Sequence, residues 1–350
     1  MLSEIIMQDI ENGCGQIEHD FIKNKTILIT GSSGLIGSYI LAYFVSLVKA
    51  GVPLEVYALT FSAPPQHMLE LINCGKIKVL QIDLSNINEY KRLPEADVII
   101  HCACYAQPML FMSNPIATMQ INISATIALL QCLRPNGSFI FISSSEVYCG
   151  LKSSAFREDC IGTTTPYHPR ASYIEGKRSG EAACNAFRSK GVRAISVRLC
   201  DVYGPGTRKH DKRALNSFIE KALLKQKIDL LDFGTAMRTY CYIGNALESL
   251  IKILFYGKYA VYNLGGHSYI TIAELAKIIG KITNVPVVFP SNEVQVAGAP
   301  EILPLDMGRI ETEFGKTEYI ELEEGLTRTV SWQRELYRNE LSLENKGYFI

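Results

Sequence analysis

The sequence predicts an α/β fold in which a doubly wound parallel sheet is joined to a smaller C-terminal lobe. Short apolar runs recur along the first 200 positions with helical stretches between them, which is the pattern of a parallel sheet. The first run leads directly into a glycine-rich turn and an apolar helix, as expected for the opening strand of such a sheet. The strands are expected at residues 25–30, 54–59, 77–81, 97–101, 138–142, 194–199 and, returning from the second lobe, 261–265.

The composition points to a small-molecule ligand. The 350 residues include 35 Lys and Arg and 35 Asp and Glu, so the net charge is zero and favours neither nucleic acid nor an anionic membrane as a partner. The ten cysteines show no Cys-x-x-Cys pair and no metal-ligand spacing, so we expect reduced core cysteines, no metal and a cytoplasmic location. The first twenty residues lack the long apolar run of a signal peptide, and no window of 18 apolar residues predicts a membrane span.

The glycine-rich turn predicts a dinucleotide site. Gly31, Gly34 and Gly37 stand between the first strand and an apolar helix that ends near Val48. Glycines permit a tight turn and a close approach of the backbone to a pyrophosphate, which then lies at the helix N-terminus, where free N–H groups favour an anion.

Two positions bear on the choice of cofactor. Thr60, at the end of the second strand, offers no carboxylate for a ribose and has no arginine beside it for a 2′-phosphate, so we expect a modest preference for NAD over NADP. Asp83, after the third strand, either accepts from the adenine amino group or caps a turn. His101, at the end of the fourth strand, is interpreted as a packed histidine rather than as a ligand or base.

A tyrosine and a lysine four residues apart form the first catalytic candidate. Tyr173 and Lys177 would lie one turn apart on one face of a helix. The pKa of a phenol is near 10, so Tyr173 can act as a base at neutral pH only if a positive charge favours its phenolate, and Lys177 can supply that charge. The alternative is an ordinary amphipathic helix.

The end of the fifth strand supplies the second candidate. Ser144 stands at the carboxyl end of a central parallel strand, where doubly wound sheets bind ligands, so it can hold a substrate hydroxyl beside Tyr173. Glu146 adds a carboxylate that could move a proton during the reaction. The alternative for Glu146 is a solvated loop residue.

These stretches together resemble a known enzyme family. Thr30-Gly31-x-x-Gly34-x-x-Gly37, the serines before Glu146, Tyr173-x-x-x-Lys177 and Val202-Tyr203-Gly204-Pro205 are similar to motifs of the extended short-chain dehydrogenase/reductases that act on nucleotide sugars, over about residues 25–326. The resemblance implies a Rossmann fold, a catalytic Ser, Tyr and Lys, and NAD that takes a hydride from the sugar, usually at C4. It also implies a substrate-binding lobe after Gly204 and a homodimer that pairs helices 115–133 and 171–190.

The resulting site assignments fall into three groups. The catalytic residues are expected to be Ser144, Glu146, Tyr173 and Lys177. The cofactor is expected to contact Gly31, Ser33, Gly34, Leu35, Ile36, Gly37, Thr60, Asp83, Leu84, Cys102, Ala103, Tyr173 and Lys177. The substrate is expected to contact Ser145, Arg213 and Arg238. Arg213 ends a charged run over 208–213, which either is solvated or suits a diphosphate or carboxylate.

Within that family, the segments at 145–148 and 169–178 most resemble UDP-glucuronate decarboxylases, also called UDP-xylose synthases. Three departures weaken the match: Asp201 replaces an asparagine, Asn245 replaces an aspartate, and Leu303 replaces a basic residue. The expected activity is therefore decarboxylation of UDP-glucuronate to a UDP-pentose or its 4-keto form. A nucleotide-sugar 4,6-dehydratase or 4-epimerase remains as an alternative, and a non-catalytic nucleotide-sensing module is the alternative from another class.

The expected domain organisation follows from these motifs. Residues 1–20 are expected to form a helical extension, to which the sequence assigns no function. Residues 21–203 plus 239–264 are expected to form the dinucleotide-binding domain. Residues 204–238 plus 265–335 form the substrate lobe, and residues 336–350 form a tail.

Overall fold

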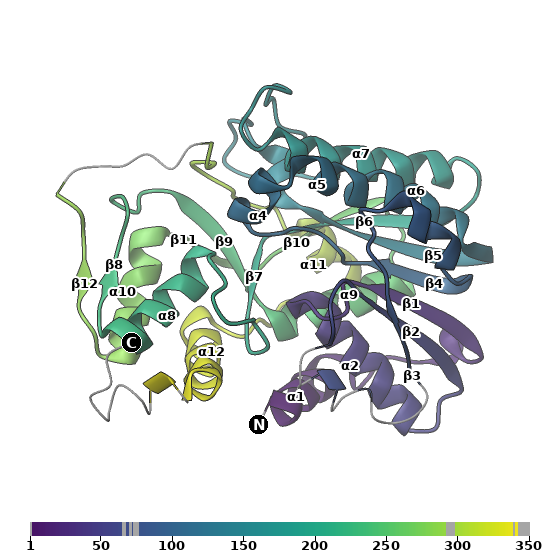
Figure 1. Ribbon diagram of the computed structural model, residues 1–350, viewed down its shortest axis with the longest axis horizontal. Coiled ribbons are helices and arrows are strands. Elements are labelled where there is room, and N and C mark those ends of the chain that lie inside the picture. The colour runs from purple at the N-terminus through teal and green to yellow at the C-terminus, as the bar shows by residue number, and fades with distance from the viewer. Residues whose placement is uncertain are drawn as a thin grey trace.

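The computed structural model describes residues 2–64, 68–69, 72, 77–291, 298–338 and 340–341, so most of the predicted tail lies outside the described residues. The strands of the main sheet are β1 (Lys25–Thr30), β2 (Leu54–Thr60), β3 (Ile77–Gln81), β4 (Ala96–His101), β5 (Leu133–Ser144), β6 (Arg193–Leu199) and β10 (Val261–Leu264). Within the described ranges these seven strands form one parallel sheet in the order β10-β6-β5-β4-β1-β2-β3 (Figure 1). The predicted doubly wound sheet is confirmed.

The central strands are apolar on both faces because both faces are covered. Along β1, Ile27 and Ile29 pack into one hydrophobic cluster and Leu28 packs into the other. Along β5, Ile140 and Phe141 divide between the same two clusters. Successive side chains of a strand point to opposite faces, so a continuous apolar run is what a sheet covered on both faces requires.

Helices cover the two faces in separate layers (Figure 1). Above the sheet in that view lie α4 (Pro108–Ser113), α5 (Pro115–Asn122), α6 (Ser124–Gln131) and α7 (Ala171–Arg188). Below it lie α1 (Leu2–Cys14), α2 (Leu35–Lys49) and α9 (Ile243–Tyr256). Short 3₁₀ helices are η1 (Asp20–Ile22), η2 (Ile87–Arg92) and η3 (Ser145–Tyr148).

The single helix expected near residues 116–133 is wrong in one respect. It is divided at Ile123 into α5 and α6, and β5 already begins at Leu133. At the break, the Asn122 amide donates to the Thr118 carbonyl at 2.8 Å and the Thr126 hydroxyl donates to the Asn122 carbonyl at 2.7 Å. Side-chain bonds of this kind compete with the regular helix ladder, and a hydropathy pattern does not show them.

The second lobe carries most of the remaining elements. Its helices are α8 (Ala214–Lys225), α10 (Ile272–Thr283) and α12 (Leu322–Leu336). Helix α11 (Gly308–Phe314) packs instead against β10 at the edge of the main sheet, where Arg309 donates to the Val261 carbonyl at 2.6 Å. The strands of the second lobe are β7 (Asp201–Tyr203), β9 (Met237–Tyr242) and β11 (Ser268–Thr271) in one small sheet and β8 (Ile228–Asp229) and β12 (Val287–Val288) in another. Thr271 and Glu274 form the capping box that starts α10. No helix in the described ranges has the length and apolarity to cross a membrane.

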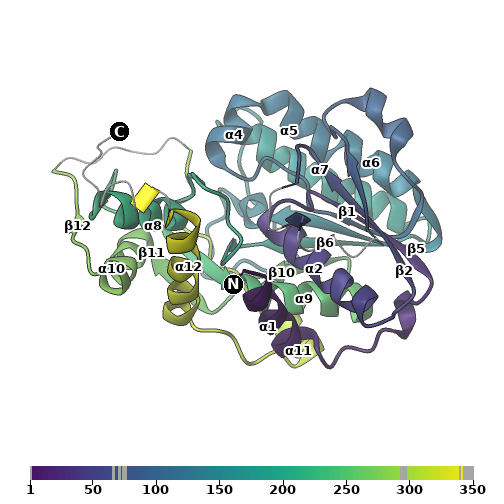
Figure 2. The ribbon, with the colours of Figure 1, turned by 60° about the horizontal axis from the view of Figure 1, so that its bottom comes forward.

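The N-terminal helix is part of the folded structure. Helix α1 ends at Cys14 and lies beside α2 and α9 (Figure 2). Its Asp9 side chain is fully buried, accepts from the Tyr242 hydroxyl at 2.9 Å and pairs with Arg328 at 3.1 Å. Asp9 therefore links the N-terminal helix to β9 and to α12.

We expect Asp9 to make stability depend on pH. Burial raises the pKa of Asp9 from 3.8 to about 6, against the opposing effects of Tyr242 and Arg328. Between about pH 4 and 6 the folded protein keeps this proton and the unfolded chain releases it, so the free energy of unfolding falls as the pH rises. A shift of about two pKa units corresponds to about 3 kcal/mol. Urea unfolding of the wild type and of Asp9→Asn should show the wild type losing about that much stability relative to the variant between pH 4 and pH 7; a constant difference would contradict the expectation.

Candidate active site

The structure brings the predicted serine and tyrosine together. Ser144 is the last residue of β5, and Tyr173 lies in the first turn of α7, which packs on that strand. The Ser144 hydroxyl hydrogen-bonds the Tyr173 phenol and also accepts from the Glu146 backbone N–H at 3.2 Å. Ser144 is 8% exposed and Tyr173 is 7% exposed. A hydroxyl pair at the carboxyl end of a central strand is suited to holding one hydroxyl group of a ligand.

Two cations, Lys177 and Arg213, bear on the expected activation of Tyr173. The Lys177 ammonium donates to the Ile142 carbonyl at 2.7 Å and lies 5.8 Å from the centre of the Tyr173 ring. Burial raises the pKa of Tyr173 well above 10, and the nearby Glu146 carboxylate adds to the rise. The hydrogen bond from Ser144 and the charge of Arg213 act in the opposite direction. The charge of Arg213 therefore lowers the pKa of the phenol.

Two side chains that the sequence did not single out complete the surroundings of Tyr173. The Phe111 ring, from α4, stacks on the Tyr173 ring with centroids 4.5 Å apart and planes 15° apart. The Arg170 guanidinium, just before α7, lies 5.5 Å from the centre of the Phe111 ring. Arg170 stands within the segment that carried the family resemblance, so that segment was its only signal. Phe111 lies in an apolar stretch that gave none.

Glu146 is buried and paired, so its interpretation as a solvated residue is wrong. Its carboxylate accepts from Arg170 at 2.5 Å, with the two side chains 15% and 7% exposed. Burial raises the pKa of Glu146; Arg170 and Arg238 lower it, and the Asp201 carboxylate raises it further. The second carboxylate oxygen, Oε2, is buried and has no hydrogen-bond partner among the described residues. That oxygen remains available to a ligand.

The two arginines predicted to bind the substrate differ in their partners. Arg213 is held by Asp211 through contacts of 2.6 to 3.2 Å. Arg238, in β9, donates to the Met237 carbonyl at 2.8 Å and to the Glu301 carbonyl at 3.5 Å. In the described part of the chain, no carboxylate lies within ion-pair distance of Arg238. Its charge lowers the pKa of the Glu146 carboxyl. The third candidate, Ser145, is buried in η3.

The glycine turn has the shape of a cradle for a dinucleotide. Gly31 has φ +62°, and a Cβ there would lie 2.7 Å from the Ala103 nitrogen; a Cβ at Gly37 would lie 2.3 Å from the Gly31 carbonyl oxygen. Gly34 is the N-cap of α2 and has no side chain to cap the helix. The N–H groups of Leu35 and Ile36, in the first turn, are therefore available to bind an anion. Thr60 Oγ1, at the end of β2, is buried and has no hydrogen-bond partner among the residues described. A cradle for phosphate and an unsatisfied hydroxyl at the ribose position fit a bound NAD.

Other predicted cofactor residues are occupied by protein contacts. Asp83 Oδ1 accepts from the backbone N–H and the hydroxyl of Ser85 at 2.9 and 2.7 Å, which is the turn-capping alternative. Leu84 is buried in the hydrophobic cluster on the α5–α7 face. The Ala103 N–H donates to Thr30 Oγ1 at 3.1 Å, and Cys102 is partly buried before it. These contacts leave their roles toward NAD as predictions.

His101 is structural, as the sequence interpretation had it. Because the Ile121 carbonyl can only accept, His101 Nε2 donates to it at 3.0 Å, and Nδ1 of the neutral ring then accepts from the Thr30 hydroxyl at 2.7 Å. Burial lowers the pKa of His101 to about 3. The ring is therefore a neutral bridge between β1, β4 and α5.

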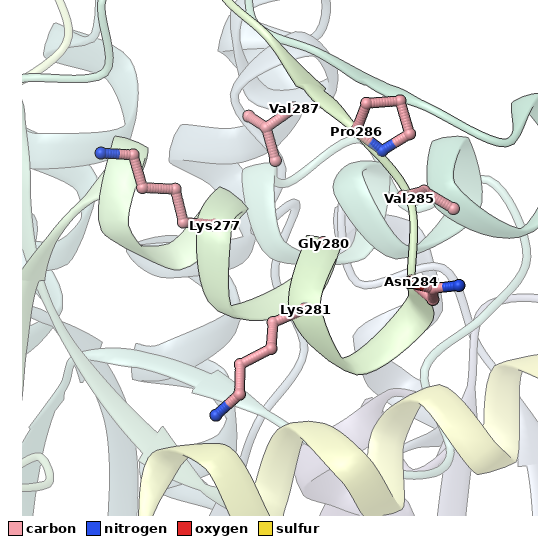
Figure 3. Close-up of a pocket in the computed structure, with 7 residues that line it drawn as sticks. All are labelled: Lys277, Gly280, Lys281, Asn284, Val285, Pro286 and Val287. Carbon is pink, nitrogen blue, oxygen red and sulfur yellow. The ribbon is translucent and has the colours of Figure 1, made fainter.

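A hollow at the far end of the second lobe is not part of this site. It is lined by residues of α10 and the segment after it: Lys277, Gly280, Lys281, Asn284, Val285, Pro286 and Val287 (Figure 3). Lys281 points toward the neighbouring helix α12 and pairs with Glu323 at 2.8 Å on the surface. This hollow presents no group suited to acid, base or hydride chemistry.

Comparison with known proteins identifies the family. Residues 27–265, more than half of the chain, match the NAD dependent epimerase/dehydratase family. The chain belongs to this family. It is thereby an NAD-dependent enzyme, which confirms the predicted family and cofactor and makes the sensing module wrong as an alternative.

Relatives within and around the family carry several activities. UDP-glucuronic acid decarboxylase 1 of Arabidopsis thaliana is 26% identical over 331 residues, which cover 93% of this chain and 72% of the relative. The dTDP-4-dehydro-6-deoxy-D-allose reductase of Streptomyces bikiniensis is 28% identical, with 89% and 96% covered.

The solved structures are equally varied. UDP-glucuronic acid 4-epimerase from Bacillus cereus, in complex with UDP-glucuronic acid and NAD, has a TM-score of 0.75 at 25% identity, with 89% of this chain and 100% of the epimerase covered. The dTDP-glucose 4,6-dehydratase DesIV from Streptomyces venezuelae has a TM-score of 0.76 at 23% identity, with 89% and 98% covered. Family membership thus gives an NAD-dependent enzyme of the epimerase/dehydratase group, and the named relatives differ in the reaction that they carry out.

Proposed function

We propose that this enzyme oxidises the sugar of UDP-glucuronate at C4 and decarboxylates it to a UDP-pentose or its 4-keto form. The observation that carries the proposal is Arg238, a cation whose charge lowers the pKa of Glu146 and which has no carboxylate partner in the described part of the chain. A uronate brings a carboxylate of its own, and a guanidinium fork matches its two oxygens. The named decarboxylases among the relatives support the same substrate class.

The first step falls to the Ser144–Tyr173 pair. Ser144 orients the C4 hydroxyl, and Tyr173 removes its proton. Arg213 and Lys177 stabilise the phenolate that this requires, Arg213 by its charge on Tyr173 and Lys177 from one helical turn away. NAD held by the glycine cradle would supply the acceptor for the C4 hydride, and its reduced form would supply the hydride that converts the 4-keto product to a UDP-pentose. Phe111 covers the face of the tyrosine ring and keeps water from it.

The second step follows from the position of the ketone. A ketone at C4 is β to the C6 carboxylate, so the C5–C6 bond can break with its electron pair passing to the ketone oxygen as CO₂ leaves. Arg238 holds the carboxylate in the orientation for that cleavage. We assign the return of a proton to C5 to Glu146, whose raised pKa keeps it able to carry one.

Dehydration at C5 and C6 is the second candidate, and one observation favours it. The Asp201 carboxylate acts on Glu146 and raises its pKa, so two carboxyl groups share the site. One charged and one neutral carboxyl would provide the base and the acid that removal of water requires. This alternative applies to a nucleotide hexose with a hydroxyl at C6.

Product analysis separates the two. Purified protein with NAD and UDP-glucuronate is expected to release one CO₂ per sugar, with a product mass of a UDP-pentose or its 4-keto form. An inert UDP-glucuronate together with a 4-keto-6-deoxy product from a UDP-, dTDP-, GDP- or CDP-hexose would replace decarboxylation by dehydration.

We also propose that the enzyme is a homodimer through the α4–α7 layer. Large apolar side chains are exposed along this layer, including Met109 at 66% and Ile116 at 74%. An exposed apolar row of this kind is typical of a subunit interface. Ile116→Asp is expected to shift the protein from dimer to monomer in size-exclusion chromatography with light scattering. Ile161→Asp, at a residue 49% exposed outside these helices, should leave the dimer intact. A wild-type monomer would contradict the proposal.

A further inference from the structure

The loop over residues 204–213, between β7 and α8, is fastened to the C-terminal part of the second lobe. The Thr207 carbonyl accepts from the Trp332 indole at 3.4 Å, and the His210 N–H donates to the Tyr337 hydroxyl at 2.9 Å. His210 has φ +57°, a left-handed backbone conformation within the loop. The loop is therefore a defined structure carried by the second lobe.

The same loop contacts the first lobe at two separate places. Arg208 donates to the Ser33 carbonyl at 3.0 Å through Nη2 and at 3.3 Å through Nε, and its Nη2 donates to the Ser33 hydroxyl at 2.7 Å. The Lys212 N–H donates to the Gln107 side-chain oxygen at 3.2 Å. Ser33 is in the turn between β1 and α2, and Gln107 is in the loop between β4 and α4.

These two contacts lie on opposite sides of the ligand crevice. β1 and β4 are neighbours in the sheet, and the chain runs outward from them in both directions, through β2 and β3 on one side and β5 and β6 on the other. The point where the strand order reverses is where a doubly wound sheet binds its dinucleotide. The loop over 204–213 thus bridges the crevice from one wall to the other.

The position of Arg208 at the start of α2 suits an anion in the crevice. Ser33 precedes Gly34, the N-cap of α2, where the helix dipole presents its positive end. A guanidinium beside that end is repelled by it unless a negative group lies between them. The Nη1 group of Arg208 has no acceptor among the described residues, so it is free to donate to such a group. The diphosphate of NAD is the anion that this turn binds in the family.

We propose that Arg208 slows the release of the cofactor. It holds the 204–213 loop across the crevice through its hydrogen bonds to Ser33, and it donates a further hydrogen bond to the diphosphate of NAD. The role concerns the family's NAD site and does not depend on which sugar reaction follows. Binding measured without a sugar substrate therefore tests it apart from the proposed decarboxylation.

The test compares Arg208→Gln with the wild type in NADH binding. The affinity is measured by fluorescence titration, and the dissociation rate by displacement with excess NAD in a stopped-flow instrument. Loss of a charged hydrogen bond is expected to weaken binding and speed dissociation by about tenfold or more, with Arg208→Lys in between. The matched control is Lys209→Gln, which removes the same charge from the same loop but from a side chain paired with Glu340 at 2.6 Å. That control should bind NADH as the wild type does.

Two further measurements decide between the parts of the proposal. ADP-ribose, which keeps the diphosphate and lacks the nicotinamide, should lose affinity for Arg208→Gln by the same factor as NADH. Gln107→Ala, which removes the acceptor of Lys212 at the other wall, should speed NADH dissociation by about threefold and serves if Arg208→Gln does not fold. Wild-type affinity and dissociation in Arg208→Gln, or an unchanged dissociation rate in Gln107→Ala, overturns the proposal.

Discussion

Replacing Tyr173 by Phe is expected to lower turnover by on the order of 10²- to 10⁴-fold while leaving NAD bound. The substitution removes one oxygen, the one that hydrogen-bonds Ser144, and keeps the ring that stacks on Phe111 at 4.5 Å. The packing around α7 therefore survives, and the loss reports on proton removal from the substrate hydroxyl. Steady-state kinetics with the identified substrate, together with NADH binding, measure the two effects separately.

The matched control for this substitution is Tyr167→Phe. Tyr167 lies six residues before Tyr173 and is 95% exposed, so the same chemical change there should leave turnover unaltered. Turnover of Tyr173→Phe within threefold of the wild type would falsify the assignment of this phenol as the base. A loss of NADH binding in the same variant would show that its effect is structural instead.

The sheet could be predicted from the sequence because burial on both faces leaves a plain signature. The bounds predicted for β1 and β3 match the structure, and those for β2, β4 and β6 differ by one residue. The break at Ile123 could not be predicted, since it depends on side-chain bonds of Asn122 and Thr126 that hydropathy does not record. The local hydropathy pattern therefore predicts the helices and strands. The point at which a long helix divides depends on side-chain hydrogen bonds that compete with those of the helix backbone.

The same distinction between local pattern and long-range contact applies to the candidate site. Tyr173, Lys177 and Ser144 could be identified because spacing on a helix and position at a strand end are local properties. The pairing of Glu146 with Arg170 joins residues 24 positions apart, and the contact of Arg208 with Ser33 spans 175 positions. Such contacts exist only after folding, so their effects, including the raised pKa of Glu146, could not be deduced from the chain.

Replacing Arg238 by Ala is expected to lower kcat/KM for UDP-glucuronate by on the order of 10²-fold. Truncating one partner of a hydrogen-bonded charge pair costs about 2 to 5 kcal/mol, and each 1.4 kcal/mol or so is a factor of ten. Among the described residues, Arg238 hydrogen-bonds only the carbonyls of Met237 and Glu301, so its removal breaks no ion pair there. The loss would then belong to the substrate carboxylate. Arg238→Lys keeps the charge without the fork and should lie between the two.

The choice of substrates makes this result specific to the carboxylate. Arg334→Ala, at an exposed arginine of α12, is the matched control and should retain wild-type kinetics. UDP-glucose shares the nucleotide and diphosphate of UDP-glucuronate but has a hydroxyl in place of the carboxylate. If Arg238 binds the substrate carboxylate, Arg238→Ala loses affinity for UDP-glucuronate and keeps its affinity for UDP-glucose in competition binding. Equal losses of affinity for both nucleotide sugars would show that Arg238 binds the diphosphate. The proposal of decarboxylation, which rests on Arg238, would then be contradicted.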